Sequence, residues 1–335
     1  MATRTQAQVT SFGGVDTVAL VSSPVPHPGR RHVLVRVTHA SVGSTDLLAR
    51  RGGYLLQPLP GFTLGYDFVG VLETTTDVSD RLGLRVGDRV AGCMPRMGAH
   101  TTHLVLDPTL LVAVPDALPS VSAATAPLDL LTAGVALKLA QVEPGGSILI
   151  QGVTGAVGVL AAELAGVGGL RVFGTASARS RAGAQGLGVT FADYTDPQWP
   201  QKVRDASGGG VDAAIDHTGS PVVKEAVAPT GTLVHTAFVG RIGQERPDTA
   251  AGGLRSSVHR WSHPRERVCS VPLFVATERR AYRAMLTDGL RMLAEGELTV
   301  PDDVAVPLGN VWEAHRLAEH PEPRSKVVLE MPETD

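Results

Sequence analysis

The sequence predicts an α/β protein in which a doubly wound parallel sheet is joined to an irregular β-barrel formed by the N-terminal residues. Strand-like and helix-like segments alternate from residue 147 onward, which is the pattern of a parallel sheet with helices on both faces. A glycine-rich turn from strand to helix, at residues 147–158, opens this alternating part. Residues 1–125 instead consist of short strand-like segments separated by glycine and proline.

The N-terminal part is predicted to consist mainly of strands. Its expected strands are residues 32–38, 68–73, 88–91 and 101–106. The first of them, HVLVRVT, alternates apolar and polar residues, as a half-buried strand does. A helical pattern then covers residues 121–140 and ends at Pro144-Gly145-Gly146. We therefore place a barrel-like catalytic domain at residues 1–125, with residues 285–335 returning to it.

The second part alternates between the two kinds of element. Its expected strands are residues 147–151, 171–175, 189–192, 211–216, 231–238 and 268–275, with helices at 157–166 and 180–187. A long amphipathic helix follows at residues 278–295, and the chain from Glu297 returns to short strands. The stretch 242–265, rich in Arg, Ser, Gly and Pro, is expected to be a loop. We assign residues 126–284 to a cofactor-binding domain.

Composition excludes several classes of partner. At 335 residues and 43% hydrophobic content, the chain can form two domains with substantial cores. A net charge of −3 and 4% aromatic residues argue against nucleic acid, since no basic field or stacking surface is present. The apolar runs near residues 157–170 are broken by Glu163 and by glycines, so we expect no membrane span. With Cys93 and Cys269 as its only cysteines, the chain fits a reducing, cytoplasmic compartment.

The turn SILIQGVTGAVG at residues 147–158 carries the strongest functional signal. An apolar strand runs into three glycines at a spacing of three, and an apolar helix follows. The glycines let the backbone approach a diphosphate, and the helix N-terminus supplies N–H groups and partial positive charge. We predict a bound dinucleotide here, the alternative being an ordinary tight turn. The residues predicted to bind it are Gly152, Thr154, Gly155, Ala156, Val157 and Gly158.

The segment 174–181 predicts which dinucleotide binds. A site that selects NAD usually carries Asp or Glu at the end of the second strand, about 20 residues after the first glycines. This segment has no carboxylate and contains Ser177, Arg179 and Arg181. Because arginine binds phosphate through two parallel N–H bonds, we predict NADPH, with its 2′-phosphate at this segment. The alternative is that both arginines are solvated residues at a helix start.

Several segments together resemble one known family. In chain order they are VLVRVTHASVGSTDLLARRGGY (33–54), LGYDFVGVLE (64–73), GLRVGDRVAG (83–92), ILIQGVTGAVG (148–158), GVDAAIDHTGS (210–220) and SKVVLEM (325–331). The chain resembles the medium-chain dehydrogenase/reductase superfamily, and within it the zinc-independent quinone oxidoreductase-like (enoyl reductase-like) branch. The resemblance covers nearly the whole length. It implies a GroES-like catalytic domain, completed by the last residues, and a Rossmann domain between its two parts.

The resemblance also bears on zinc. It places the cysteine ligand of zinc-dependent relatives near Gly43 and their Gly-His-Glu at residues 65–67, which here read Gly-Tyr-Asp. If His100 and His103 lie on one strand, their odd spacing points them to opposite faces. We therefore expect no metal. Without a Lewis acid, an activated C=C is a better substrate than a simple carbonyl, because the developing oxyanion then needs only hydrogen-bond donors.

Three residues of the first domain are candidates for the chemistry. Similar segments of the family keep a tyrosine at the position of Tyr54, and the resemblance implies a proton donor or substrate contact. The alternative is a tyrosine packed at the mouth of the cleft. Many relatives carry an asparagine near the nicotinamide where this chain has Gly43, and Ser44, Thr45 or the substrate itself is a candidate replacement. Asp67 and Asp46 are expected to organise loops through hydrogen bonds, and Cys93 to pack in the core.

The resemblance further implies cofactor contacts in the second domain. Thr132 is expected near the cofactor, and a helix threonine bonded to its own backbone is the equal alternative. Tyr194 is expected beside the adenine ribose or its phosphate, and Phe238 and Gly240 are expected to pass the nicotinamide. We interpret residues 217–220 as a plain turn at a strand end.

These observations together predict a zinc-independent, NADPH-dependent oxidoreductase that reduces an enone, an enoyl thioester or a quinone by hydride transfer. A metal-free carbonyl reductase or alcohol dehydrogenase, and a non-catalytic NADP(H)-binding protein, are the alternatives. The only expected partner besides a small-molecule substrate is a second copy of the chain. A homodimer would pair through the apolar segment 268–275, although Pro272 also fits a buried edge strand.

Overall fold

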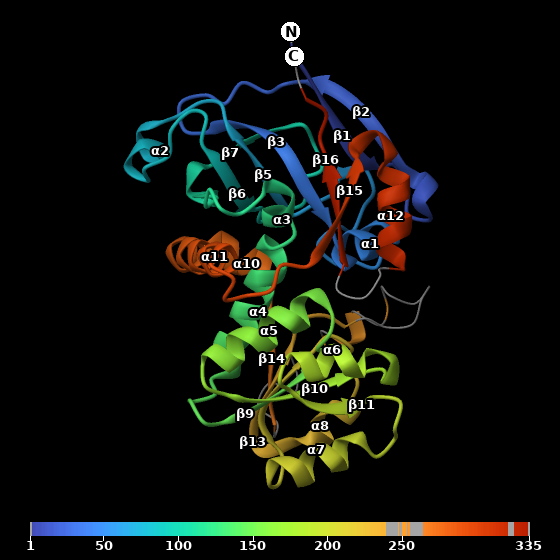
Figure 1. Ribbon diagram of the computed structural model, residues 1–335. Coiled ribbons are helices and arrows are strands. Elements are labelled where there is room, and N and C mark those ends of the chain that lie inside the picture. The colour runs from blue at the N-terminus through green and yellow to red at the C-terminus, as the bar shows by residue number, and fades with distance from the viewer. Residues whose placement is uncertain are drawn as a thin grey trace. The chain divides into compact units, whose positions relative to one another are not determined.

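The computed structural model describes residues 2–238, 247, 250–252, 254, 264–320 and 325–333 (Figure 1). The chain divides into two compact units, which are described separately. Unit 1 comprises Met1–Leu131 and Val271–Asp335, and unit 2 comprises Thr132–Ser270. The sequence places the corresponding boundaries after residues 125 and 284.

Unit 1 contains two sheets. Its strands are β1 (Thr3–Val9), β2 (Val18–Pro24), β3 (Val33–Val42), β4 (Phe62–Thr63), β5 (Asp67–Leu72), β6 (Arg89–Cys93), β7 (His103–Leu106), β8 (Leu111–Ala113), β15 (Asp302–Pro307) and β16 (Ser325–Glu330). One sheet has the order β15-β16-β3-β5-β6-β8, with β7 also paired to β3, and the other has the order β2-β1-β4. In β3 the alternating side chains of Val33, Val35 and Val37 are buried, which is why this segment forms a strand with one face in the core.

The helices of unit 1 lie between and after these strands. They are α1 (Ser44–Arg50), α2 (Asp77–Arg81), α3 (Ser120–Ala124), α10 (Val271–Thr277), α11 (Arg279–Ala294) and α12 (Val311–Glu319), with 3₁₀ turns at Val15–Thr17, Pro108–Leu110 and Leu308–Asn310. Helix α4 (Pro127–Ala140) runs from unit 1 into unit 2. The single helix expected at residues 121–140 is therefore two helices, because Pro127 starts a new one: proline fits a first turn but breaks a helix interior.

Unit 2 is a parallel α/β sheet. Its strands are β9 (Ser147–Gln151), β10 (Arg171–Ala176), β11 (Thr190–Asp193), β12 (Val211–Asp216), β13 (Val227–His235) and β14 (Arg265–Val268), and its helices are α5 (Ala156–Val167), α6 (Arg181–Gly186), α7 (Trp199–Ser207) and α8 (Val222–Ala226), with a 3₁₀ turn at Ala178–Ser180. The strand order is β11-β10-β9-β12-β13-β14. Helices α5 and α6 cover one face and α7 and α8 the other (Figure 1), as right-handed crossovers require. This doubly wound sheet confirms the predicted fold class.

The core of unit 2 lies between the sheet and its helices. Leu149 of β9, Phe173 of β10 and Leu233 of β13 are buried together with Trp199 and Val203 of α7. Burial of such side chains contributes about 1.5–3 kcal/mol each. These strands carry apolar residues on both faces because helices cover both faces.

The expected strand at residues 268–275 is wrong. Strand β14 ends at Val268, and Val271–Thr277 forms helix α10. Pro272 lies in the first turn of that helix, where its missing N–H leaves no hydrogen bond unmade. The apolar pattern of this segment therefore reflects burial of Val271, Phe274 and Val275 on one helical face. Because residues 271–277 form a helix, the strand pairing predicted for a homodimer interface is withdrawn. The chain after Glu297 also contains helix α12 besides its strands.

Candidate cofactor loop and active site

The glycine loop of unit 2 has the geometry that the sequence predicts. Strand β9 ends at Gln151, and Gly152 has a φ of +65°, which favours glycine. A Cβ at Gly158 would lie 2.3 Å from the carbonyl oxygen of Gly152, so no larger residue fits without moving the loop. Gly155 is the N-cap of α5. The loop therefore brings backbone amides of a helix N-terminus to the carboxyl end of β9, where an anion is stabilised.

The remaining loop residues lie where the prediction expects them. Thr154 is in the turn, and Ala156 and Val157 open the first turn of α5. The loop is anchored to β10, because the N–H of Val153 donates to the carbonyl oxygen of Thr175 at 3.0 Å. The Thr175 hydroxyl donates to the Gln151 side chain. The loop backbone is thus held in place by the neighbouring strand.

The strand order identifies where a ligand belongs in unit 2. From β9 the sheet grows in one direction through β10 and β11, and in the other through β12, β13 and β14. In open α/β sheets, ligands bind at the carboxyl ends of the strands where the order reverses, which here is between β9 and β12. The glycine loop follows β9, and residues 217–220 follow β12. The His217 ring packs on the glycine loop, since a Cβ at Gly152 would meet its Cε1 at 2.9 Å.

The predicted phosphate segment follows β10. Ser177 and Arg179 lie at the 3₁₀ turn, and Arg181 is the first residue of α6. The Arg181 guanidinium lies over the Phe191 ring, with its central carbon 4.4 Å from the ring centroid. Tyr194 follows β11 and is 52% exposed. The structure thus gathers the predicted residues at the ends of β10 and β11, on the glycine-loop side of the reversal point.

The other cofactor predictions fall in three places. Thr132 lies in α4, where its carbonyl oxygen accepts from the Cys269 thiol at 3.9 Å. Phe238 follows β13, and its ring centroid is 4.9 Å from that of His235. Gly240 lies outside the described residues, as does most of the 242–265 stretch.

In unit 1, Tyr54 pairs with Tyr66. Their hydroxyl oxygens are 2.8 Å apart, and the rings meet edge to face at 6.1 Å. Tyr66 is buried and directly precedes β5, while Tyr54 follows α1. Burial raises the pKa of Tyr54 to about 12, and burial also raises the pKa of Tyr66. Both phenols therefore stay protonated at neutral pH, so each is able to donate a proton or a hydrogen bond.

Asp46 holds the two loops that carry this pair. Its Oδ1 accepts from the N–H of Gly65 and its Oδ2 from the N–H of Gly43, both at 2.9 Å. Asp46 is buried on α1. These bonds fix the chain before Tyr66 against the start of the helix that leads to Tyr54. The carboxylate thus organises loops, as the sequence predicts.

Asp67 lies in a buried polar pocket beside this pair. Its Oδ1 accepts from the Ser41 hydroxyl at 2.7 Å and its Oδ2 from the N–H of Leu128 at 3.1 Å. Burial raises the pKa of Asp67 to about 7, although the Lys326 ammonium and the Ser41 hydrogen bond oppose this shift. Both carboxylate oxygens already have partners within unit 1, which fits the predicted loop-organising role.

A lysine completes the pocket. Lys326 Nζ donates to Asp129 Oδ2 at 2.6 Å, and both side chains are buried. Burial works to lower the pKa of Lys326, but Asp129 and Asp67 outweigh it and hold that pKa above its ordinary value. A Cβ at Gly43 would lie 3.3 Å from Lys326 Nζ. A cation therefore lies beside the position that the resemblance assigns to the cysteine ligand of zinc-dependent relatives.

The donor set at this place does not fit zinc. Gly43 has no side chain, Tyr66 is engaged with Tyr54, and Asp67 is engaged with Ser41 and Leu128. Zinc prefers thiolate and imidazole ligands in tetrahedral arrangement. In the part of the chain that the structure describes, no group of three or more His, Cys, Asp or Glu side chains is placed to hold a metal.

Further candidates from the sequence are placed elsewhere. Ser44 is exposed at the start of α1. His100 is buried, with its Nε2 2.8 Å from the carbonyl oxygen of Ser41, and His103 starts β7 with its Nδ1 3.1 Å from the Thr102 hydroxyl. Burial raises the pKa of the Cys93 thiol, which keeps it protonated and agrees with a packing role.

The sequence reasoning missed Tyr66, Lys326 and Asp129 as members of this site. Tyr66 lies in the segment LGYDFVG, and the resemblance presents it only as the residue that replaces a zinc-ligating histidine. Lys326 stood in the terminal SKVVLEM, whose strand β16 pairs with β3. The signal available in the sequence was the resemblance, which assigns the last residues to the catalytic domain; the pairing brings them beside the residues that precede Gly43.

Comparison with known proteins agrees with this architecture. The family model described as "Alcohol dehydrogenase GroES-like domain" matches residues 29–116, and the one described as "Zinc-binding dehydrogenase" matches residues 187–329. The quinone oxidoreductase of Pseudomonas syringae pv. Tomato DC3000 has a TM-score of 0.80 at 25% identity, covering 98% of this chain and 99% of that one. The chain belongs to the medium-chain dehydrogenase/reductase superfamily, in its quinone oxidoreductase-like branch. It is thus a member of an oxidoreductase family whose members bind a nicotinamide cofactor.

Other relatives extend the comparison. The JamJ enoyl reductase in its apo form shares the fold, with a TM-score of 0.81 at 21% identity over 99% of this chain and 100% of that one. The synaptic vesicle membrane protein VAT-1 homolog of Danio rerio is 27% identical over 336 residues, which is 96% of this chain and 69% of that protein. The chain spans smaller shares, 54% and 15%, of the next two curated relatives. Within the described residues, no helix has the length and hydrophobicity needed to cross a membrane.

Proposed function

We propose that this chain is a zinc-independent, NADPH-dependent oxidoreductase that reduces an activated C=C, in an enone or enoyl thioester, or a quinone. The observation that carries the proposal is the Tyr54–Tyr66 phenol pair, in which Tyr66 occupies the position that the resemblance assigns to the histidine of the Gly-His-Glu of zinc-dependent relatives. A phenol pair supplies hydrogen-bond donors and a proton but no Lewis acid. That is what an enolate or a reduced quinone requires.

The cofactor supplies a hydride when it is bound. An enone that accepted this hydride at its β-carbon would lose its C=C π bond and carry negative charge on its carbonyl oxygen. The Tyr54 hydroxyl donates a hydrogen bond to this oxygen or a proton to the resulting enolate. The Tyr66 hydroxyl then stabilises the Tyr54 phenolate through its 2.8 Å contact until water returns the proton.

NADPH is favoured by the charge of the segment after β10. Ser177, Arg179 and Arg181 lie there, and no carboxylate stands between residues 174 and 181 to bind a free ribose hydroxyl. An added phosphate would find cationic side chains that form parallel N–H bonds.

The homodimer also stays a proposal, although the strand pairing predicted for its interface is withdrawn. Light scattering, which measures the molar mass in solution, tests it.

The test is oxidation of NADPH in the presence of a panel of enones, enoyl thioesters and quinones, for the wild type and for Tyr54→Phe. We expect turnover with at least one class and a loss of about tenfold or more in kcat for the variant. Glu313→Gln, on the exposed surface of α12, is the matched control and should leave turnover unchanged. No turnover by the wild type across the panel would contradict the proposal. An alcohol product with its C=C intact would favour the carbonyl reductase alternative.

A further inference from the structure

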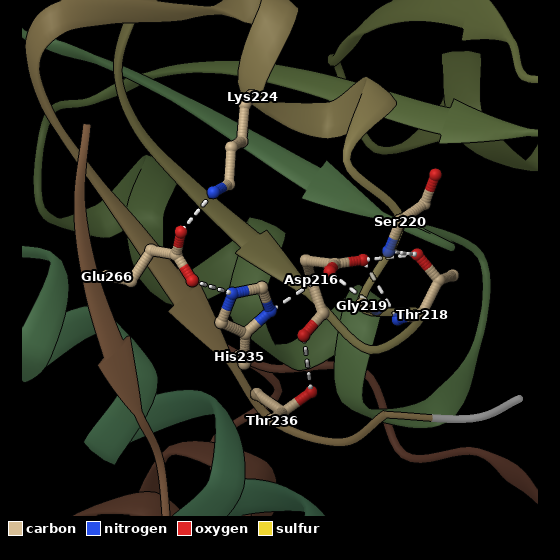
Figure 2. A network of polar contacts seen from close by, with 8 residues as sticks. All are labelled: Asp216, Thr218, Gly219, Ser220, Lys224, His235, Thr236 and Glu266. Atoms are coloured by element: carbon tan, nitrogen blue, oxygen red, sulfur yellow. Dashed lines mark hydrogen bonds and ion pairs between the residues drawn. The ribbon is translucent and has the colours of Figure 1, made fainter. Parts of the chain in front are cut away.

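Four ionisable side chains from β12, α8, β13 and β14 form a continuous row of polar contacts. The Lys224 ammonium contacts Glu266 Oε1, Glu266 Oε2 lies 3.3 Å from His235 Nε2, and His235 Nδ1 lies 3.1 Å from Asp216 Oδ2. Figure 2 shows the His235 ring between the two carboxylates, with the lysine at the outer end. Basic and acidic side chains therefore alternate from Lys224 to the buried Asp216.

Burial makes this alternation necessary. Asp216 is 0% exposed, and His235 and Glu266 are each 3% exposed. A buried carboxylate without a partner costs several kcal/mol, so each of the two needs a cation or donors. A carboxylate only accepts hydrogen bonds, and both ring nitrogens of His235 face one. His235 thus places one ring nitrogen against each carboxylate, and the Lys224 ammonium contacts Glu266 as well.

Asp216, the innermost of the four side chains, shapes the turn after β12. Asp216 Oδ1 accepts from the N–H of Thr218 at 2.8 Å and from its hydroxyl at 2.7 Å, and Oδ2 accepts from the N–H of Gly219 at 2.8 Å. Burial works to raise the pKa of Asp216, but the hydrogen bonds from His235 and Thr218 outweigh it and hold that pKa below its ordinary value. The ionised carboxylate is thus what holds the turn, and His235 is its only side-chain partner from another strand among the contacts drawn in Figure 2.

This turn flanks the reversal point of the sheet. Residues 217–220 follow β12, and the glycine loop follows the adjacent β9. His217, the first residue of the turn, packs on Gly152 of that loop. A shift of Asp216 would therefore move the turn and one wall of the crevice where dinucleotides bind in this fold. The sequence alone presented the turn as a plain strand end.

We propose that His235 is a positioning residue for cofactor binding: held between Asp216 and Glu266, it fixes the Asp216 carboxylate and thereby the turn 217–220 beside the glycine loop. Glu266 reaches Asp216 through the His235 ring, and the Lys224 ammonium contacts Glu266. The proposal rests on the cofactor binding of the proposed function and adds to it the residues that hold the crevice in its binding form.

The test is a double-mutant cycle on cofactor affinity with His235→Gln, Glu266→Gln and the double variant. Calorimetry with NADPH and with NADH gives the Kd of each. We expect His235→Gln to weaken binding about tenfold and Glu266→Gln about threefold, since hydrogen bonds to charged groups are among the stronger ones. In the His235→Gln background, Glu266→Gln should add no further loss. Gln201→Ala, which removes an exposed hydrogen bond to Asp205 in the same unit, is the matched control and should leave the Kd unchanged.

The cycle separates positioning from stability. Loss of stability with an unchanged Kd in folded His235→Gln would overturn the proposal, as would losses of affinity that add in the double variant. If His235→Gln fails to fold, the Glu266→Gln variant is the test by itself. An unchanged Kd in that variant would show that Glu266 does not affect cofactor binding through His235, and would overturn the proposal. Nitrogen NMR of ¹⁵N-labelled histidine gives a direct signature: a proton on Nδ1 of His235, the nitrogen that faces Asp216, supports the proposal, and an Nδ1 without a proton overturns it. A wild type that binds neither cofactor would overturn the proposed function, and this inference with it.

Discussion

The glycine loop of unit 2 and the tyrosine pair of unit 1 are specified in different ways. The loop is made by backbone within a few consecutive residues, and the contact of Gly158 with the Gly152 carbonyl oxygen fixes its shape. The pair is made by side chains from two segments, beside a pocket that joins Asp129 and Lys326, which are 197 positions apart. A site made of backbone is therefore visible in the local sequence, whereas a site made of side chains depends on the pairing of distant strands.

The largest effect is expected from Lys326→Met. The change leaves Asp129 and Asp67 buried without their cation, and breaking a buried ion pair on one side costs about 3–5 kcal/mol of unfolding free energy. Urea denaturation measures it. Lys202→Met removes an exposed pair and should cost less than about 1 kcal/mol. Equal costs for the two variants would show that the pocket does not depend on its long-range ion pair.

The next largest effect is on NADPH binding, and it distinguishes two glycines of helix α5, Gly158 and Gly166. Gly158→Val places a side chain against the Gly152 carbonyl oxygen and should weaken NADPH binding by about 3 kcal/mol, which is roughly a hundredfold. Gly166→Ala, also in α5, has open space at its Cβ and should leave the Kd unchanged. It should stabilise the fold by about 0.5–1 kcal/mol. Calorimetry and thermal unfolding measure both. Unchanged binding by Gly158→Val would contradict a backbone-made site.

A smaller effect concerns pH and Asp67. Its pKa is about 7 in the folded chain against 3.8 ordinarily, so between these values the folded chain binds the extra proton. The unfolding free energy therefore falls as pH rises from about 4 to about 7, by about 2 kcal/mol between pH 5 and pH 7. It levels off once the pH is above the pKa of the folded chain. Asp67→Asn should flatten this part of the stability curve. A wild-type slope that persists in the variant would assign it to other groups.

The smallest effect tests the pair itself. Tyr66→Phe removes the hydroxyl that contacts Tyr54 and keeps the ring, so we expect kcat to fall about tenfold, equal to about 1.4 kcal/mol. The Kd for NADPH should not change. Rapid-mixing kinetics with saturating cofactor separates the two quantities. A change in cofactor affinity without a change in kcat would remove Tyr66 from the chemistry.

The sequence predicts the fold better than the first-unit site. Strands β9 and β12 were predicted with the bounds that the structure has, because each is a short, mostly buried run that directly follows a glycine. The prediction of a strand after Val268 was wrong, because an apolar run of that length suits either a strand or a helix. Pro272, which fits the first turn of a helix, decides between them. Lys326 was missed because its partner Asp129 is 197 positions away, and only the pairing of β16 with β3 brings the lysine beside Gly43.

The central claim is hydride transfer from NADPH to the carbon–carbon double bond of an activated substrate. The most direct measurement uses NADPH deuterated at the transferring position of the nicotinamide, with an enone that the enzyme consumes, and product analysis by NMR. Deuterium on the β-carbon of a saturated ketone is the predicted result. Deuterium on the carbinol carbon of an alcohol that keeps its C=C would contradict the account, as would the absence of deuterium transfer.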